Sequence, residues 1–192
     1  STSLLEACCG ALHAAIQDSD EHKNLCLSTG AVDAIICLIM VHPHDTFLLE
    51  RALNVLVSLS SLEISGAAID NAGGVGIVVD TMRSNATSPG IINLGSRFIV
   101  NMVATDPKYA NEFVPAVVSM LSCAKDQIKN EEMIERICKS LHCLVLLSEN
   151  CADRVISADG VAVIEMAMRE NEGNIVITQV CNILLQILNK IT

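Results

Sequence analysis

The stretch "STGAVDAIICLI" (Ser28–Ile39) decides the fold, because closely related phrases return further along the chain. In this stretch a single Gly stands directly before a run of almost entirely apolar residues. The other copies are "NAGGVGIVVDTM" at Asn71–Met82, "EFVPAVVSML" at Glu112–Leu121 and "SADGVAVIEMAM" at Ser157–Met168. The copy at Glu112–Leu121 has no Gly. A phrase that returns at a nearly constant interval indicates an internally repeated protein.

The first Val of each phrase serves as an anchor for measuring the repeat. These anchors are Val32, Val75, Val114 and Val161, so successive copies are 43, 39 and 47 residues apart, with a mean of 43. Each phrase follows a short, polar-capped stretch and precedes a turn and a longer stretch with apolar residues at helical spacing. We therefore expect each unit to contain a short helix, a Gly or turn, a middle helix, a loop and a long helix.

The third copy differs from the others in length. From its capping residue, Asp106, it takes 8 residues to reach the anchor Val114, whereas the other copies take 12. Pro is favoured at the first position of a helix. We therefore expect the third unit to have a shortened first helix, a middle helix that starts at Pro115, and a local irregularity near Glu112–Pro115.

A unit of about 40–47 residues with three helices and a Gly between the first two resembles the armadillo repeat. The joints "STGAV" and "SADGV" carry this resemblance, which covers nearly the whole chain. It implies an all-α, right-handed superhelix of about four armadillo repeats preceded by the third helix of another repeat. The constant phase of the anchors disfavours the alternative, in which these Gly residues are ordinary helix C-caps of an unrelated bundle.

The implied domain is a single armadillo solenoid over residues 1–192, which we take as a piece of a longer protein. Its units fall at about 3–17 for the partial repeat, and then at 20–61, 62–104, 105–148 and 149–191.

Composition restricts the class of partner and the compartment. The chain carries a net charge of −10, which argues against general binding to nucleic acid or to an anionic membrane surface. No apolar run reaches the roughly 20 residues of a membrane span. The nine Cys, most of them in apolar helical patterns, predict buried free thiols and a cytoplasmic location. Nuclear and cytoskeletal locations stay open. The Cys residues in such patterns are Cys26, Cys37, Cys123, Cys143 and Cys181.

In a stack of armadillo units, the resemblance implies that the third helices line a concave groove. Polar residues recur along these helices about once per unit, which predicts a ladder on one face. Amide and hydroxyl side chains at this spacing can bind the backbone of an extended peptide. The alternative is a solvated helix face, which shows the same period. The candidate partner-binding residues are His13, Asn54, Ser58, Arg97, Asn101, Lys139, His142, Asn182 and Gln186.

One departure from the family pattern concerns the kind of peptide. Armadillo proteins that carry basic import signals typically repeat Trp-x-x-x-Asn along the third helices. This chain has no Trp; Arg97 occupies the Trp position, and only Asn101 matches the Asn. The aromatic faces that stack on Lys stems are therefore absent, which disfavours import signals as ligands.

No motif in the sequence supports catalysis or metal binding. The pairs Cys9/His13 and Cys138/His142 each offer two ligands on one helix face, but they lie too far apart in a solenoid to form one site. The Gly-rich "AGGVG" follows no strand and lacks a Lys-Ser/Thr, so it does not predict a phosphate site. We therefore expect no catalytic residue, no metal and no cofactor.

The functional prediction is a non-catalytic scaffold or adaptor that binds a protein or an extended peptide along the groove. The alternative is a structural segment of a larger assembly, packed through its ends and outer face and able to associate end to end. An enzyme on a helical scaffold would require a clustered pocket of titratable residues.

Overall fold

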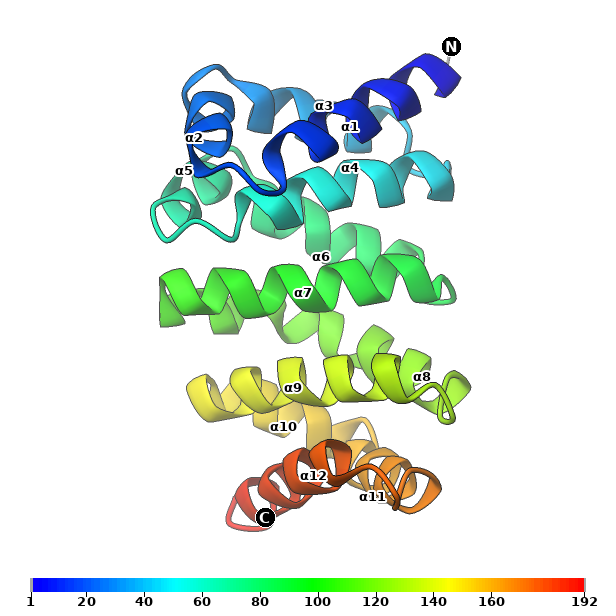
Figure 1. Cartoon of the computed structure of the whole chain (residues 1–192). Coiled ribbons are helices and arrows are strands. Elements are labelled where there is room, and N and C mark those ends of the chain that lie inside the picture. Colours follow the sequence, from blue (N-terminus) through cyan, green and yellow to red (C-terminus); the bar gives the residue numbers. More distant parts are fainter. Residues whose placement is uncertain (1, 192) are drawn as a thin grey trace.

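The computed structural model describes residues 2–191, which form twelve α-helices and one 3-10 helix and contain no strand. The helices pack in sequential order along one axis (Figure 1). Their bounds are α1 (Thr2–Ile16), α2 (Asp20–Ser28), α3 (Ala31–Val41), α4 (Thr46–Leu59), α5 (Ser65–Asn71), α6 (Gly74–Ser84), α7 (Pro89–Thr105), η1 (Pro107–Ala116, the 3-10 helix), α8 (Val117–Asp126), α9 (Glu131–Leu147), α10 (Glu149–Ser157), α11 (Gly160–Glu170) and α12 (Ile175–Leu188).

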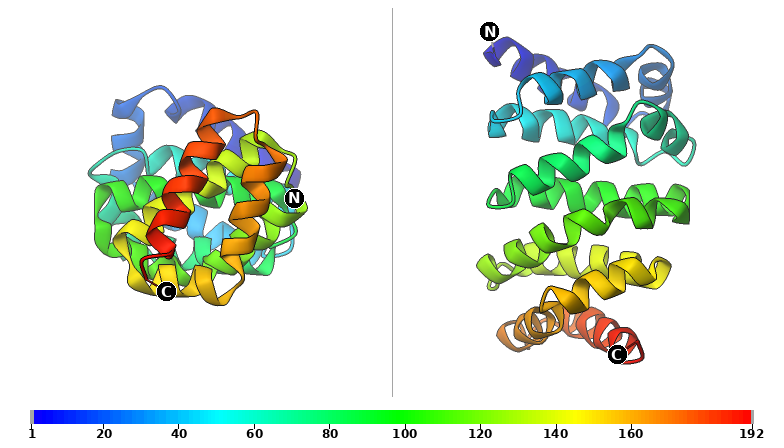
Figure 2. Two further views of the ribbon diagram at one scale, coloured as in Figure 1. Left: turned by 90° about the horizontal axis from the view of Figure 1, so that it is seen from below. Right: turned by 180° about the vertical axis from the view of Figure 1, so that it is seen from behind.

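Five helices, α1, α4, α7, α9 and α12, lie side by side and form one face of the molecule (Figure 1). Each contacts the next in this series, and the remaining helices cover the rear of the layer (Figure 2). Each unit thus contacts its sequence neighbours, which is the arrangement of a helical-repeat solenoid. The apolar sides of these helices share one continuous core, which consists mostly of Leu, Ile, Val, Ala, Met and Cys side chains and also holds Phe98, Tyr109 and Phe113.

Side-chain caps set the starting points of the long helices. The N-cap residues of α4, α7, α9 and α12 are Asp45, Ser88, Asn130 and Asn174, and each side-chain oxygen accepts a hydrogen bond from a backbone N–H in the first turn. Such a bond satisfies a donor that the helix itself leaves unpaired. The caps are 43, 42 and 44 residues apart, so the long helices start in nearly constant register.

The middle helices start at an even more regular interval. The residues that precede α3, α6, α8 and α11 are Gly30, Gly73, Ala116 and Asp159, each 43 residues after the last. Gly30, Gly73 and Asp159 are left-handed, with φ of 78°, 80° and 56°, whereas Ala116 has a φ of −78°. A left-handed residue lets one helix end and the next leave at a sharp angle.

This even step shows that the expected shortening of the third unit is wrong. The anchor Val114 was misplaced, because the residue equivalent to Val75 is Val118, two positions after the N-cap of α8. The first helix of this unit is not shorter, since η1 has ten residues and α2 has nine. Pro115 lies inside η1, and the middle helix begins at Val117.

The irregularity near Glu112–Pro115 exists, but it concerns the type of helix. The 3-10 helix η1 runs directly into α8 without a left-handed joint. Pro115 has no N–H to donate, so a regular α-helical bond pattern cannot continue through it. Tyr109 and Phe113 of η1 are buried, and the ring of Phe113 meets Phe98 of α7 edge to face at 6.2 Å. These rings anchor η1 on the core.

The cysteines follow the expectation with one exception. All nine are free thiols; Cys123 and Cys181 are buried, and Cys26 and Cys143 are half-buried. Burial raises the pKa of Cys123 to about 11, so this thiol is unreactive at neutral pH. Cys37 is exposed, contrary to the expectation, because it lies on α3 at the end of the stack, where none of the described residues covers it.

Three neighbouring glycines at the start of α6 allow a test of the joint. Gly73 is left-handed with open space around it, so Gly73→Ala should cost about 1 kcal/mol of unfolding free energy from backbone strain alone. At Gly74 a Cβ would lie 2.8 Å from the carbonyl oxygen of Ile69, so Gly74→Ala should cost about 1–3 kcal/mol.

The matched control is Gly76→Ala, because Gly76 is exposed, helical and surrounded by open space. This change should stabilise the chain by about 0.5 kcal/mol, since Ala is the better helix former. Urea unfolding followed by circular dichroism measures all three variants. Equal effects at the three positions would contradict the roles assigned to Gly73 and Gly74.

Candidate groove across the long helices

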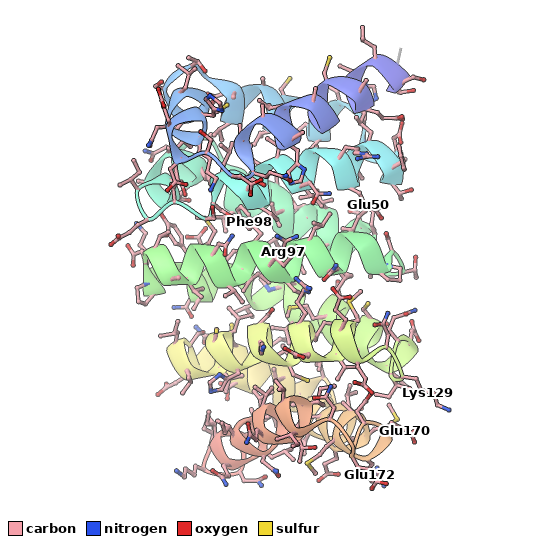
Figure 3. The ribbon with its side chains drawn as sticks, in the orientation of Figure 1. Glu50, Arg97, Phe98, Lys129, Glu170 and Glu172 are labelled. Carbon is pink, nitrogen blue, oxygen red and sulfur yellow. The ribbon has the colours of Figure 1, made fainter. Side chains whose placement is uncertain are left out.

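A groove of about 780 Å³ runs across the face made by the long helices. It draws its walls from α1, α4, α7 and α9, and Arg97 of α7 lies in the middle of this face (Figure 3). We call it the central groove. Its lining residues are His13, Gln17, Asp18, Asn54, Val57, Ser58, Ser61, Ser96, Arg97, Val100, Asn101, Glu132, Glu135, Arg136 and Lys139.

The nine candidate residues divide into two groups. Six of them line the central groove, and these are His13, Asn54, Ser58, Arg97, Asn101 and Lys139. The other three do not line it. His142 is half-buried on α9, whereas Asn182 and Gln186 are exposed on α12, which contributes no lining residue.

Register along the long helices explains why His142 is displaced. Asn54, Arg97 and Lys139 each lie nine positions after the N-cap of their helix, so they form one column. His142 lies twelve positions after its cap, and three further residues turn a side chain by about 300° around the helix. The position on α12 that continues the column holds Ile183, not Asn182.

Asn101 joins two long helices and therefore has a structural role. Its Nδ2 donates to the carbonyl oxygen of Val57 at 3.1 Å and to Ser60 Oγ at 3.0 Å, both at the end of α4. By contrast, Asn54 Nδ2 donates to the carbonyl oxygen of Glu50, within its own helix, at 3.0 Å. The Nδ2 of each asparagine is therefore already used as a donor within the protein. The Oδ1 of each forms no hydrogen bond among the described residues.

Ser140 makes the corresponding link between α7 and α9. Its buried Oγ lies 3.0 Å from the carbonyl oxygen of Ser96 and 2.8 Å from that of Arg136, to which it donates. One hydroxyl therefore holds the backbone of Ser96, and with it the adjacent Arg97, close to the backbone of Arg136. Both arginines line the central groove.

Charges in the groove are mixed, and most of them are paired. On α9, Arg136 Nη2 lies 2.8 Å from Glu132 Oε1, and Lys139 pairs with Glu135. Arg97 has no ion pair or side-chain hydrogen bond with any described residue. Its guanidinium is thus an uncompensated positive charge at the groove centre, although the whole chain carries −10.

Burial, and then the positive charge of the groove, lowers the pKa values of His13 and Arg97. The pKa of His13 is lowered by burial first, and then by the charges of Arg97 and Arg51, while Asp18 opposes them. The imidazole therefore holds its proton less well than a free one and is mostly neutral at pH 7. Burial, followed by the nearby Arg136, also lowers the pKa of Arg97, which stays charged at any physiological pH.

Ser96 and Arg136 are among the groove residues that the sequence did not identify as candidates. Ser96 is fully buried and adjoins Arg97, so it does not lie on the polar face of the helix. Arg136 lies six positions after its cap, where α4 has Arg51 and α7 has Leu94. Numbering from the caps instead of from the Val anchors would have paired Arg136 with Arg51.

Other kinds of site receive no support from the geometry. Within residues 2–191, no three His, Cys, Asp or Glu side chains gather as a metal site. No helix in this range has, on its own, the length and hydropathy of a membrane span. The helices α2 and α3 meet that test only when taken together, and they join at a bend of 73°.

Among protein-family models, curated proteins and solved structures, only solved structures match this chain. No protein-family model matches the sequence, and no curated protein matches it. The structure is similar to the crystal structure of an engineered protein from the Northeast Structural Genomics Consortium, with a TM-score of 0.63 and 14% sequence identity. The likeness covers 100% of this chain and 92% of the engineered one. It shows an all-helical, repeat-like fold, and at this identity it says nothing of function.

The two groove asparagines provide a test of the structural link. Asn101→Ala should cost about 1–2 kcal/mol of unfolding free energy, because it leaves Ser60 Oγ and the carbonyl of Val57 without their partner on α7. The matched control Asn54→Ala should change it by less than about 0.5 kcal/mol, since only a bond within one helix is lost. Chemical denaturation measures both; equal costs would contradict the assignment.

Proposed function

We propose that this chain is a non-catalytic scaffold of armadillo type that binds an extended segment of a partner protein along the central groove. The observation that carries the proposal is the column Asn54, Arg97 and Lys139, which repeats at the same position of three successive long helices. The constant 43-residue step and the order of short, middle and long helices support about four armadillo repeats in a right-handed superhelix. A cytoplasmic adaptor role accords with nine free thiols.

The spacing of the column suits an extended peptide. Packed helices are about 8–10 Å apart, so the four helices α1, α4, α7 and α9 span roughly 24–30 Å of groove. An extended chain advances about 3.3 Å per residue, so about seven to nine residues would cross this distance. The polar groups that line the groove would then meet a partner's backbone and every second side chain.

The proposal can be tested with peptides of random sequence. Phage-displayed dodecapeptides selected on the immobilised chain should lose at least tenfold in affinity when Ser58→Tyr fills the groove between α4 and its neighbours. The matched control is Ser122→Tyr, which adds the same side chain at an exposed site on α8, in the rear layer. Failure to select any peptide, or equal loss in both variants, would overturn the proposal.

A second candidate function is association through the ends of the stack. An apolar pocket of about 370 Å³ lies between α1 and α3, and Val41 beside it is 64% exposed. At the other end, Ile175 and Ile183 of α12 are exposed. Apolar patches that stay uncovered commonly mark interaction sites, and these two ends could meet head to tail.

Sedimentation velocity separates the two functions. End association predicts a sedimentation coefficient that rises with protein concentration and falls back to the monomer value in Val41→Lys. The matched control Val118→Lys places the same charge on a half-exposed Val of α8, away from either end, and should leave association unchanged. A concentration-independent monomer would contradict the end-association function.

A further inference from the structure

We propose that the centre of the central groove is a subsite for one acidic side chain of the bound segment, whose carboxylate is held by Arg97 with Arg136 and Ser96. This inference rests on the proposed function, because it names the chemistry of the partner residue at one position of the same groove. Three structural features carry it: an unpaired cation, two buried donors without acceptors, and the link that brings them together.

The unpaired cation is Arg97. Five cationic side chains of the described residues form ion pairs, and Arg97 is not among them. It is exposed at the middle of a groove wall, so its guanidinium can reach a ligand without displacing a protein partner. A planar guanidinium binds a carboxylate through two parallel hydrogen bonds, which gives the contact both strength and direction.

The donors without acceptors are Ser96 Oγ and Arg136 Nε, and both residues line the groove. Ser96 is 0% exposed, whereas Arg136 is held by Glu132 through Nη2 and leaves Nε unused. A buried donor without a partner costs about 1–3 kcal/mol, so a ligand that supplies an acceptor here gains affinity. A carboxylate is such a ligand, since its two oxygens accept several hydrogen bonds and donate none.

Ser140 holds these groups together. Its hydroxyl is within hydrogen-bond distance of the carbonyl oxygens of both Ser96 and Arg136, so the α7 and α9 donors occupy one stretch of groove. Because Ser140 is fully buried, this spacing is set by the core and not by flexible surface contacts. The backbone segments that carry the donors are therefore held at a fixed spacing before any ligand arrives, which lowers the entropic cost of binding.

The groove's own carboxylates limit the subsite to a single acidic residue. Glu132 and Glu135 are neutralised by Arg136 and Lys139, but they still flank the site on α9. Asp18, whose Oδ2 accepts a hydrogen bond from Gln17, lies at the α1 side. A partner with several successive acidic residues would place some of them against these groups, and like charges repel.

An oriented peptide library tests the inference on the full chain. Four pools of nonapeptides carry Glu, phosphoserine, Gln or Lys at the central position and equal mixtures of neutral residues elsewhere. The Glu pool should be retained at least fivefold more than the Gln and Lys pools. Arg97→Gln should remove that preference, whereas Arg154→Gln, which alters an exposed and unpaired Arg on α10, should keep it.

The outcomes separate this inference from the proposed function. If all pools bind equally and Ser58→Tyr still blocks them, the groove binds peptides but has no acidic subsite. If no pool binds, both proposals fail. Stronger retention of the phosphoserine pool than of the Glu pool would contradict the proposal that the subsite binds a carboxylate. Circular dichroism of Arg97→Gln checks that the variant is folded, which its exposure predicts.

Discussion

The packing of each long helix on the next is the interaction on which the rest of this molecule depends. It repeats because the residues before the middle helices, Gly30, Gly73, Ala116 and Asp159, lie 43 residues apart, and all of them except Ala116 are left-handed. Caps at the long helices then fix where each begins. Side chains that lie the same number of residues after their N-caps therefore form a column across the long helices. A groove across several helices follows from this arrangement.

Hydrogen bonds between neighbouring units reinforce this packing at the groove. Asn101 and Ser140 each join their helix to a backbone carbonyl 44 residues earlier. These bonds tie a side chain of one unit to the backbone of the unit before it, so they favour one register of the stack over its alternatives. They also decide which groove groups stay free for a ligand: the guanidinium of Arg97 is free, whereas the Nδ2 of Asn101 is not.

The centre of the groove is positively charged, although the whole chain is negatively charged. The surplus of acidic residues makes the protein anionic, yet the pairing of Glu132 and Glu135 on α9 leaves Arg97 as an isolated cation. Its influence reaches His13 on α1, whose pKa it lowers. An anion bound beside Arg97 would offset this repulsion, so binding and the protonation of His13 are linked.

The sequence was sufficient to predict the period, the all-helical fold and the joints at Gly30 and Gly73, because the apolar phrases and their Gly residues are local signals. In "SADGV" the left-handed residue is Asp159, whereas the Gly that follows it is the first residue of α11. Two of the sequence's register errors share one physical cause. Val114 and Val118 are four residues apart, and Lys139 and His142 are three apart, so both members of each pair lie about one helical turn apart. An amphipathic pattern hardly distinguishes such positions.

The links of Asn101 and Ser140 could not be predicted either, because their partners lie one unit away. A local pattern says that a polar residue is present on a helix, but not which carbonyl it will meet across the stack. The free guanidinium of Arg97 was likewise visible only once the ion pairs of α9 were known.

An NMR measurement of the His13 pKa, with and without a bound central-Glu nonapeptide, tests whether Arg97 holds a carboxylate at the centre of the central groove. Burial lowers the pKa of His13 first, the charges of Arg97 and Arg51 lower it further, and the charge of Asp18 raises it. A carboxylate held at Arg97 should raise that pKa, so the peptide should also bind more tightly as the pH falls through the titration of His13. A His13 pKa that is unchanged by saturating peptide would contradict an anion at the centre of the groove.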